Sequence, residues 1–454
     1  MSSDDTPNTE TDAADSDGRE PGTNTGQSDA PAAIERLVRA SAVERALISV
    51  SALLLSVAVG FVLILAAGRM TTCSTAATTY FGVGFCYDPV TVYDLLFLGA
   101  FGDLSSDLIN GQLATTLSQT TVLMFTGVAV AVAFRAGIFN IGTQGQLVVG
   151  ALGSAVATLW ASTLVSGVVG TLLLLPFGLA VGAFVGGVYG AIPGALKAYA
   201  DANEVITTIM LNFVATAVAL YLVQDHFQDP ESVATQTVPL PEYATFPSVI
   251  FRARDDFSLV AFVVAAALLV AVYLLIERTS FGYDLRTSGI QPEAAEYGGV
   301  DAARTVVASM TLSGALAGMG GAVYVLMIIG NFQTGVPAYG FDGITVSILA
   351  GNNPLGVGFA ALLFGVLKSG SIVVDVGTDV PPQLVGVLRG LIILFVAMPE
   401  FFRMIGTRVW SVRPSGSGGQ PVTDGGTVAD SRGDVEDDVD AESGVPTEGG
   451  ERDE

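Results

Sequence analysis

The feature that most constrains the fold of this chain is a series of long apolar segments separated by short polar ones. A helix of roughly 20 apolar residues crosses the hydrocarbon layer of a membrane, which is about 30 Å thick. Hydrophobic residues make up 51% of the 454 residues and charged residues only 14%, which argues against an ordinary soluble domain. Nine apolar runs have suitable length: 46–67, 114–134, 145–163, 168–192, 203–223, 257–276, 304–329, 355–373 and 383–398.

A tenth apolar run, 341–351, has only about eleven residues and is too short to span a membrane as a straight helix. It must be a half-helix, a re-entrant segment or a strongly broken span. Backbone groups in lipid are satisfied by helices or closed barrels, and runs of this length indicate helices. We therefore expect an all-α fold, a polytopic membrane helical bundle of about ten transmembrane helices.

The distribution of basic residues predicts the orientation. If the short run crosses the membrane, eleven basic residues fall on the side of the N-terminus and three on the other side. Positive residues favour the cytoplasmic side, so both termini are expected in the cytoplasm of a multi-pass protein in the cell membrane. Lys368 and Arg389 fall within spans. The expected outer loops are about 68–113, 224–256 and 330–340.

The net charge of −24 is concentrated at the two ends of the chain. Residues 1–33 hold 8 acidic residues and 1 basic one, and residues 414–454 hold 12 and 2, so these tails carry −17. Low hydrophobicity with high charge predicts disorder. We expect disordered acidic tails at 1–33 and 414–454 around a membrane domain at 34–413. Such tails can bind a partner, but they also suit the salt-rich cytoplasm of a halophilic archaeon.

Two cysteines and one histidine carry little functional signal. Cys73 and Cys86 both fall in the first expected outer loop, where a disulfide between them is allowed but not required. His226 lies in the second outer loop, where a lone histidine is usually solvated. The sequence therefore predicts no metal site and no cofactor.

Two polar interruptions occur at membrane depth. The first covers 140–146, and the second runs from 340–343 through 351–356. Irregular backbone in a membrane is tolerated where it is buried in protein or lines a wet cavity. Breaks at corresponding positions of two halves favour a transport pathway, whereas each single glycine or amide is equally consistent with close helix packing.

The expected inner loop at 277–301 contains a different signal. Its segment 292–299 begins with proline and ends with glycine around Glu-Ala-Ala-Glu, a pattern typical of a short helix. A membrane subunit driven by a separate motor must present such a rigid element to the motor. The alternative is a plain interfacial helix.

Six motifs together resemble one protein family. The run at 293–298 is similar to the EAA loop of ABC importer permeases, whose short helix docks on the ATPase. The sequence FRAGIFNIG at 134–142 resembles the simple sugar and nucleoside (branched-chain amino acid permease-like) branch of these importers. So do segments 202–212, 313–318, 340–344 and 352–356, and the resemblance covers about 114–400.

This resemblance implies a bundle of two repeated halves that pairs with itself or with a sister permease. The partners would be a cytoplasmic ABC ATPase and an extracellular lipoprotein-like solute-binding protein, and the chain itself would not be an enzyme. The implied coupling residues are Glu293, Ala294, Ala295 and Gly298. The implied pathway residues are Asn140, Gln144, Gln146, Asn212, Asp342, Asn352 and Asn353.

The chain departs from the family pattern at two positions. Relatives often have an acidic residue where Gln144 stands, so a carboxylate there is not essential in this chain. They often have an amide where Arg389 stands. A cation inside a span is usually paired or faces water, so Arg389 could pair with Asp342 or face the pathway.

The leading hypothesis is the permease of an ATP-driven importer for a nucleoside or simple sugar. The sequence has no phosphate-binding loop of the Gly-x-x-x-x-Gly-Lys-Ser/Thr type, so the motor must be another chain. An ion-coupled carrier is the alternative, with Asp342 as its one plausible titratable group. A membrane enzyme is disfavoured because the catalytic motifs HExxH and Gly-x-Ser-x-Gly do not occur.

Overall fold

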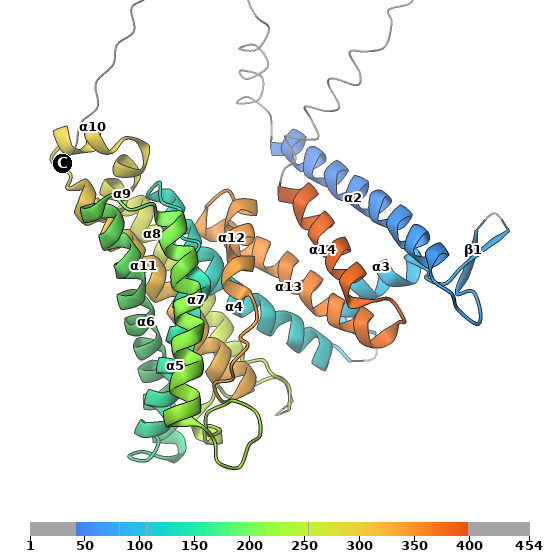
Figure 1. Cartoon of the computed structure of the whole chain (residues 1–454), viewed down its shortest axis with the longest axis horizontal. Coiled ribbons are helices and arrows are strands. Elements are labelled where there is room, and N and C mark those ends of the chain that lie inside the picture. The colour runs from blue at the N-terminus through green and yellow to red at the C-terminus, as the bar shows by residue number, and fades with distance from the viewer. Residues whose placement is uncertain (1–41, 81, 106, 253, 398–454) are drawn as a thin grey trace, which may run out of the picture. The chain divides into compact units, whose positions relative to one another are not determined.

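The computed structural model describes residues 42–397 apart from residues 81, 106 and 253, and these residues form mainly helices (Figure 1). The two acidic tails and both boundaries of the expected membrane domain lie outside the described residues. Each of the ten predicted runs overlaps a helix: α2 (Ala42–Met70), α4 (Gly111–Arg135), α5 (Thr143–Ala161), α6 (Gly167–Ala200), α7 (Glu204–Leu222), α8 (Leu259–Arg278), α11 (Ala302–Val323), α12 (Tyr339–Leu349), α13 (Pro354–Gly377) and α14 (Pro382–Ala397).

Seven of the helices in the described part are long and apolar enough to cross a membrane. The protein is therefore a multi-pass membrane protein. Helix α12 has 11 residues and α14 has 16, so both are short for a crossing. Helix α5 has 19 residues, but its first turn holds Thr143, Gln144 and Gln146, which lower its apolar character. The expected count of ten spans therefore stays a prediction.

Helices α4 and α11 form the centre of the main core. They pack against each other, α4 also packs on α12 and α13, and α11 packs on α5 and α6. The contact between α6 and α11 is made by glycines, because a Cβ atom on Gly182 would lie 2.8 Å from the carbonyl oxygen of Gly318. Small residues let the two backbones approach closely, as is common between membrane helices.

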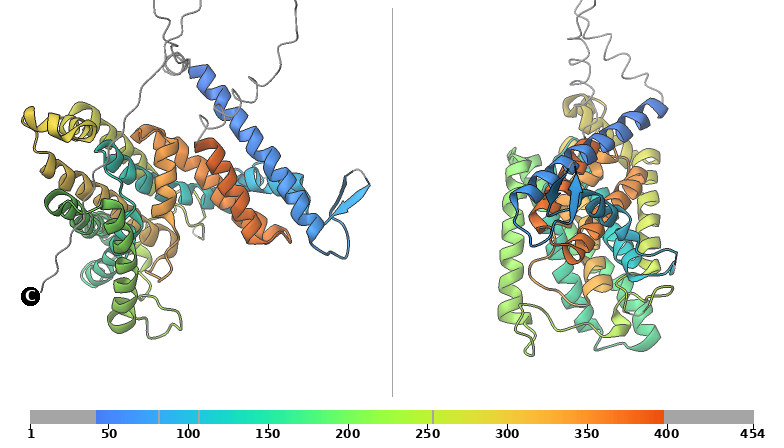
Figure 2. Two further views of the ribbon diagram at one scale, coloured as in Figure 1. Left: turned by 45° about the horizontal axis from the view of Figure 1, so that its top comes forward. Right: turned by 90° about the vertical axis from the view of Figure 1, so that its right-hand side faces the viewer.

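A second hydrophobic core joins α2, α3 (Pro89–Phe97), α13 and α14. Figure 2 shows α2 and α14 side by side. A hairpin of β1 (Thr78–Tyr80) and β2 (Val83–Phe85) follows α2, and a Cys73–Cys86 disulfide closes it. The sequence left this disulfide open, and the prediction of a purely helical fold missed both short strands and α3. The 3₁₀ turn η1 (Gly99–Phe101) then leads to α4.

Two helices continue into π-helical turns before long connections. Helix α7 extends into η2 (Val223–Phe227), which carries the exposed His226, and α11 extends into η4 (Tyr324–Ile329). The connection after η2 includes the 3₁₀ turn η3 (Glu242–Ala244) and touches the second connection through a bridge between Gln236 and Gln333. The two long connections, one after η2 and one after η4, are therefore in contact with each other.

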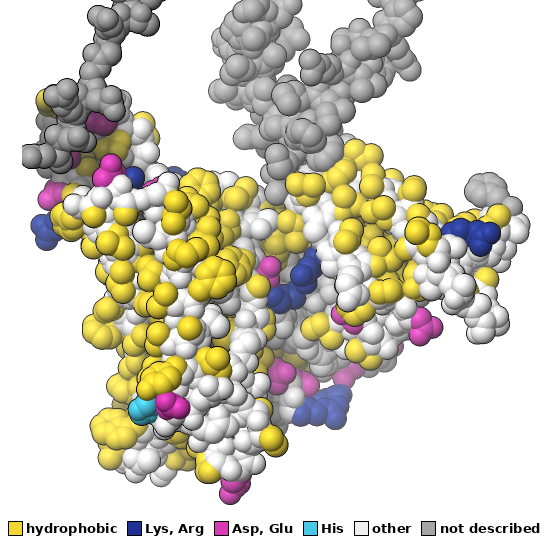
Figure 3. Space-filling view, viewed as in Figure 1, with side chains coloured by type: hydrophobic (Ala, Val, Ile, Leu, Met, Phe, Trp, Pro, Cys, Tyr) yellow, Lys and Arg dark blue, Asp and Glu magenta, His cyan; other side chains and the backbone are white. Residues whose placement is uncertain are grey.

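The short helices α9 (Ser280–Ile290) and α10 (Pro292–Tyr297) lie together between the end of α8 and the start of α11 (Figure 1). On the face drawn in Figure 3, hydrophobic side chains cover much of the surface, while charged side chains lie mostly towards its edges and in one small group of both signs near its middle. This distribution fits helices whose sides contact lipid.

Candidate functional site

Helix α5 begins at the first predicted break, and a neighbouring helix supplies its N-terminal cap. The non-helical residues are 136–142, so Thr143 to Gln146 form the first helical turn and are not part of the break. The N-cap residue, Gly142, has no side chain to accept a hydrogen bond. Asn212 of α7 takes this role: its Oδ1 accepts from the Gly145 N–H at 2.7 Å, and its Nδ2 donates to the Ile141 carbonyl at 3.0 Å.

Helix α12 is capped in the same way by α5. Its N-cap residue, Ala338, has only a methyl group, and the Gly340 N–H donates to Oε1 of Gln144 at 2.8 Å. The Nε2 of Gln144 also donates to the carbonyl of Pro337 at 3.1 Å. A Cβ atom on Gly340 would lie 2.7 Å from the Thr143 carbonyl carbon, so a larger residue would separate the two helices.

The two breaks of the sequence are therefore in direct contact. The sequence placed the second break from 340–343 through 351–356. Residues 340–343 instead belong to the start of α12, and the non-helical segments on either side of α12 are 330–338 and 350–353. The glycine at 340 serves close approach to α5. A small cavity of about 70 Å³ borders this contact and is lined by Gln144, Val148, Thr216, Ala219, Phe332, Thr334, Gly335 and Val336.

Asn140 and Gln146 form a reciprocal amide pair next to this contact. Nδ2 of Asn140 donates to Oε1 of Gln146 at 2.9 Å, and Nε2 of Gln146 donates to Oδ1 of Asn140 at 3.2 Å. Asn140 also donates to Oγ of Ser313 on α11 at 2.8 Å. Both amides are buried, each 1% exposed. In this conformation they tie the break to α11, and their place in a solute pathway stays a prediction.

The acidic residue of the second half is paired with a lysine. Asp342 lies 2.6 Å from Nζ of Lys368 on α13, and this ammonium also stands 4.2 Å above the ring of Tyr339. The hydroxyl of Tyr339 donates to Oε1 of Gln119 on α4. Within the described part of the chain, the ion pair that involves Asp342 is made by Lys368, and Arg389 makes none. Of the two alternatives that the sequence left open for Arg389, the pair with Asp342 is therefore not formed in this structure. A lysine within a predicted span was the available signal for Lys368.

Asn352 and Asn353 build the turn between α12 and α13 and do not reach the Gln144 contact. Asn353 caps α13 by accepting from the Leu355 N–H at 3.0 Å. Asn352 has a φ of +56°, a left-handed conformation that asparagine tolerates. Its Oδ1 accepts from Ser347, and its carbonyl accepts from Nε of Arg135 at 2.9 Å. The predicted pathway residues thus separate into two groups.

The predicted short helix in the 277–301 loop is confirmed as α10. Pro292 occupies its first turn, and Gly299 follows it with a φ of +85°. Glu293, Ala294 and Gly298 are exposed, whereas Ala295 is 6% exposed and anchors the helix. Tyr297 and Ile290, which sequence reasoning did not single out, are 96% and 85% exposed. Two exposed apolar side chains beside an exposed helix favour a protein contact.

No group of three or more His, Cys, Asp or Glu side chains that could hold a metal ion occurs among the described residues. The chemistry that the site offers is hydrogen bonding by neutral amides, hydroxyls and backbone groups, with one neutralised ion pair. Such groups suit passage and recognition of polar molecules.

Comparison with known proteins agrees with the resemblance seen in the six motifs. A family model described as the permease component of the branched-chain amino acid transport system matches residues 112–397. A nucleoside ABC transporter permease of Lactococcus lactis, NupB, is 32% identical over 73% of this chain and 90% of its own length. A guanosine ABC transporter permease of Bacillus subtilis, NupP, is 35% identical over 70% and 88%.

A glucose ABC transporter permease of Haloferax volcanii, TsgB13, is 31% identical over 70% of this chain and 82% of its own length. All three relatives are permease subunits of ABC transporters. The family match covers well over half of the chain. The chain therefore belongs to the branched-chain amino acid transport system permease family, in the branch of ABC transporter permeases that includes those for nucleosides and sugars.

Proposed function

We propose that this chain is the permease subunit of a binding-protein-dependent ABC importer that moves a nucleoside or a simple sugar. The energy comes from ATP hydrolysis by a partner subunit on the cytoplasmic side. The observation that carries the proposal is α10, an exposed six-residue helix anchored by Ala295 with an exposed Tyr297 at its end. A carrier that alternates access without a motor has no use for such an element.

The first turns of α5 and α12, which meet at Gln144, are the proposed gate. Helices α5 and α12 are held by two side-chain caps from neighbouring helices, and such polar contacts have two discrete states, formed and broken. The packing of α4 on α12 and α13 parallels that of α11 on α5 and α6, which supports two repeated halves. Together with the bias of basic residues, this arrangement supports ten crossings and cytoplasmic termini.

The partners of the proposed complex are an ABC ATPase, a second permease and an extracellular solute-binding protein. Two permeases from L. lactis, NupB and NupC, and two from B. subtilis, NupP and NupQ, resemble this chain, which favours a sister permease over a second copy. The solute is proposed to be uncharged, since Lys368 neutralises Asp342 and the remaining polar side chains around Gln144 are neutral.

The test is uptake by vesicles that contain the permease with and without its ATPase. Uptake that requires both the ATPase and ATP supports the importer. Uptake that persists without the ATPase and follows an ion gradient would establish the ion-coupled carrier instead. A thermal-shift screen of the cognate binding protein with nucleosides, pentoses and hexoses then identifies the solute class.

A double variant, Glu293→Lys with Gly298→Pro, tests the role of α10. The lysine reverses a charge on the exposed face, and the proline disturbs the end of the helix. We expect ATP hydrolysis to continue while uptake is lost, with normal insertion into the membrane. Unchanged uptake in this variant would contradict the docking role of α10.

A further inference from the structure

Three charged side chains meet where α4, α8 and α9 come together. Glu277, near the end of α8, lies with Oε1 3.2 Å from a terminal nitrogen of Arg135 and with Oε2 2.7 Å from a terminal nitrogen of Arg286. Arg135 is the last residue of α4, and Arg286 belongs to α9. The three side chains are 26% to 35% exposed, so water screens them only in part.

This cluster is connected to both irregular segments. Arg135 directly precedes the non-helical residues 136–142 that lead to α5. Its Nε donates to the Asn352 carbonyl at 2.9 Å, and Asn352 belongs to the turn between α12 and α13. The Arg135 guanidinium thus joins Glu277 to the turn between α12 and α13, and its own backbone leads directly into the first break.

Backbone contact adds a second link between α9 and the first break. A Cβ atom on Gly289 of α9 would lie 2.6 Å from the Arg135 carbonyl oxygen and 2.9 Å from the Gly137 nitrogen. Gly137 has a φ of +72°, which other residues adopt only with strain. The end of α9 therefore presses directly on the chain between α4 and α5, with no side chain between them.

Helix α10 follows α9 directly, with Gln291 as the single residue between them. The Gln291 N–H donates to the Thr287 carbonyl at 3.2 Å, and the Ala295 N–H donates to the Gln291 carbonyl at 3.1 Å. Because the two helices share Gln291 and pack on each other, a displacement of α10 is expected to move α9. Helix α9 is joined to the first break by the Glu277 cluster and by Gly289.

We propose that Glu277 is a positioning residue that transmits movement of the α9–α10 element to both irregular segments. This inference rests on the proposed function, because it assumes that an ATPase moves α10. The carboxylate attracts two arginines that otherwise repel each other, so the cluster holds α4 and α9 together only while Glu277 is charged. Glu277→Gln removes the attraction and leaves two cations facing each other.

The experiment compares the whole reconstituted complex of permeases, ATPase and binding protein with and without Glu277→Gln. We expect ATP hydrolysis to persist and solute uptake per ATP to fall about tenfold, a common size for coupling between two sites. Amide hydrogen exchange is measured with and without a non-hydrolysable ATP analogue. In the wild type, nucleotide should change exchange at 292–299, at 136–142 and at 350–353. In Glu277→Gln, the change at 292–299 should remain and the change at 350–353 should be lost. The change at 136–142 should only weaken, because Gly289 still contacts the backbone there.

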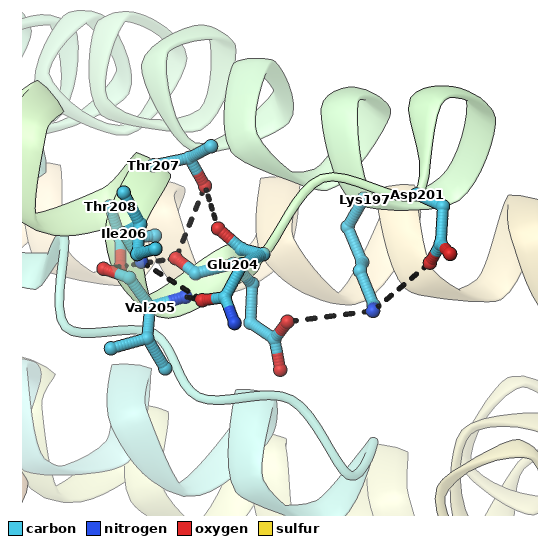
Figure 4. Close-up of polar contacts among 8 residues, drawn as sticks. Lys197, Asp201, Glu204, Val205, Ile206, Thr207 and Thr208 are labelled. Atoms are coloured by element: carbon cyan, nitrogen blue, oxygen red, sulfur yellow. Dashed lines mark hydrogen bonds and ion pairs between the residues drawn. The ribbon is translucent and has the colours of Figure 1, made fainter. Parts of the chain in front are cut away.

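Glu204→Gln is the matched control. Glu204 lies 3.6 Å from Lys197, which also contacts Asp201, at the corner between α6 and α7 (Figure 4). The side chain of Glu204 is 19% exposed, similar to Glu277, but its ion pair touches neither break. This control should leave the exchange response at 136–142 and 350–353 intact.

The possible outcomes test the role of Glu277 separately from the proposed function. If the segment at 350–353 responds to nucleotide in Glu277→Gln as it does in the wild type, the proposed role of Glu277 is wrong. If nucleotide changes nothing at 292–299 in the wild type, the motor-driven function itself is wrong. Should Glu277→Gln fail to assemble, Arg286→Gln leaves the Arg135–Glu277 pair in place and must produce the same loss of response.

Discussion

Asn212→Leu should destabilise the first turn of α5, although Asn212 itself belongs to α7. The substitution removes the acceptor of the Gly145 N–H and the donor to the Ile141 carbonyl. Asn212 is 7% exposed, so water does not readily replace it. Leaving a buried donor or acceptor unpaired costs about 1–3 kcal/mol, which for two groups gives a total of about 2–6 kcal/mol.

The assay is amide hydrogen exchange on a peptide that covers 141–149. A local loss of about 2 kcal/mol, at about 1.4 kcal/mol per factor of ten, corresponds to exchange that is roughly 30-fold faster. Met210→Leu on the same helix is the control, because Met210 is 53% exposed and should leave exchange unchanged. Exchange at 141–149 that stays at the wild-type rate in Asn212→Leu would refute the capping role.

Three further predictions concern other contacts. Gln144→Glu should lower the melting temperature at neutral pH. An ionised carboxylate still accepts from the Gly340 N–H but cannot donate to the Pro337 carbonyl. A melting temperature equal to that of the wild type would contradict this prediction. Cys73→Ser should destabilise the β1–β2 hairpin by about 3 kcal/mol, the entropy of a short closed loop, and limited proteolysis at 74–85 measures it. Burial alone would raise the pKa of Asp88, but hydrogen bonds from Thr91, Val90 and Tyr80 lower it below 3.8. The stability that Asp88 contributes is thus present above pH 3.8 and lost as the pH falls below it, so the melting difference between wild type and Asp88→Asn should shrink in acid.

The sequence predicted the helices well because membrane helices are specified by local composition. The positions of all ten apolar runs and of α10 follow from hydropathy, proline and glycine alone. The strands and α3 were missed because 68–113 has mixed polarity and its order depends on a disulfide and on packing against α2 and α13. No local sequence pattern predicts such contacts between residues that lie far apart in the chain.

The candidate site was predicted in part for the same reason. Polarity at membrane depth identified Asn140, Gln144 and Asp342, but their partners lie far away in the sequence, such as Ser313 for Asn140 and Pro337 for Gln144. Lys368 was recognised only as a cation within a span, and the partner of Asp342 required the structure. The Glu277 cluster joins residues 142 positions apart, and no spacing pattern could reveal it.

The amide at position 144 has a structural reason that the sequence alone did not provide. In the sequence, the amide at this position indicated only that a carboxylate is not essential there. In the structure, Gln144 must accept from one N–H and donate to a carbonyl at the start of the same helix, and an amide does both without charge. The amide is therefore explained by helix capping, whatever the solute. Evidence for a neutral solute rests instead on the Asp342–Lys368 pair and on the cavity beside Gln144, because these groups remain once the capping contacts are accounted for.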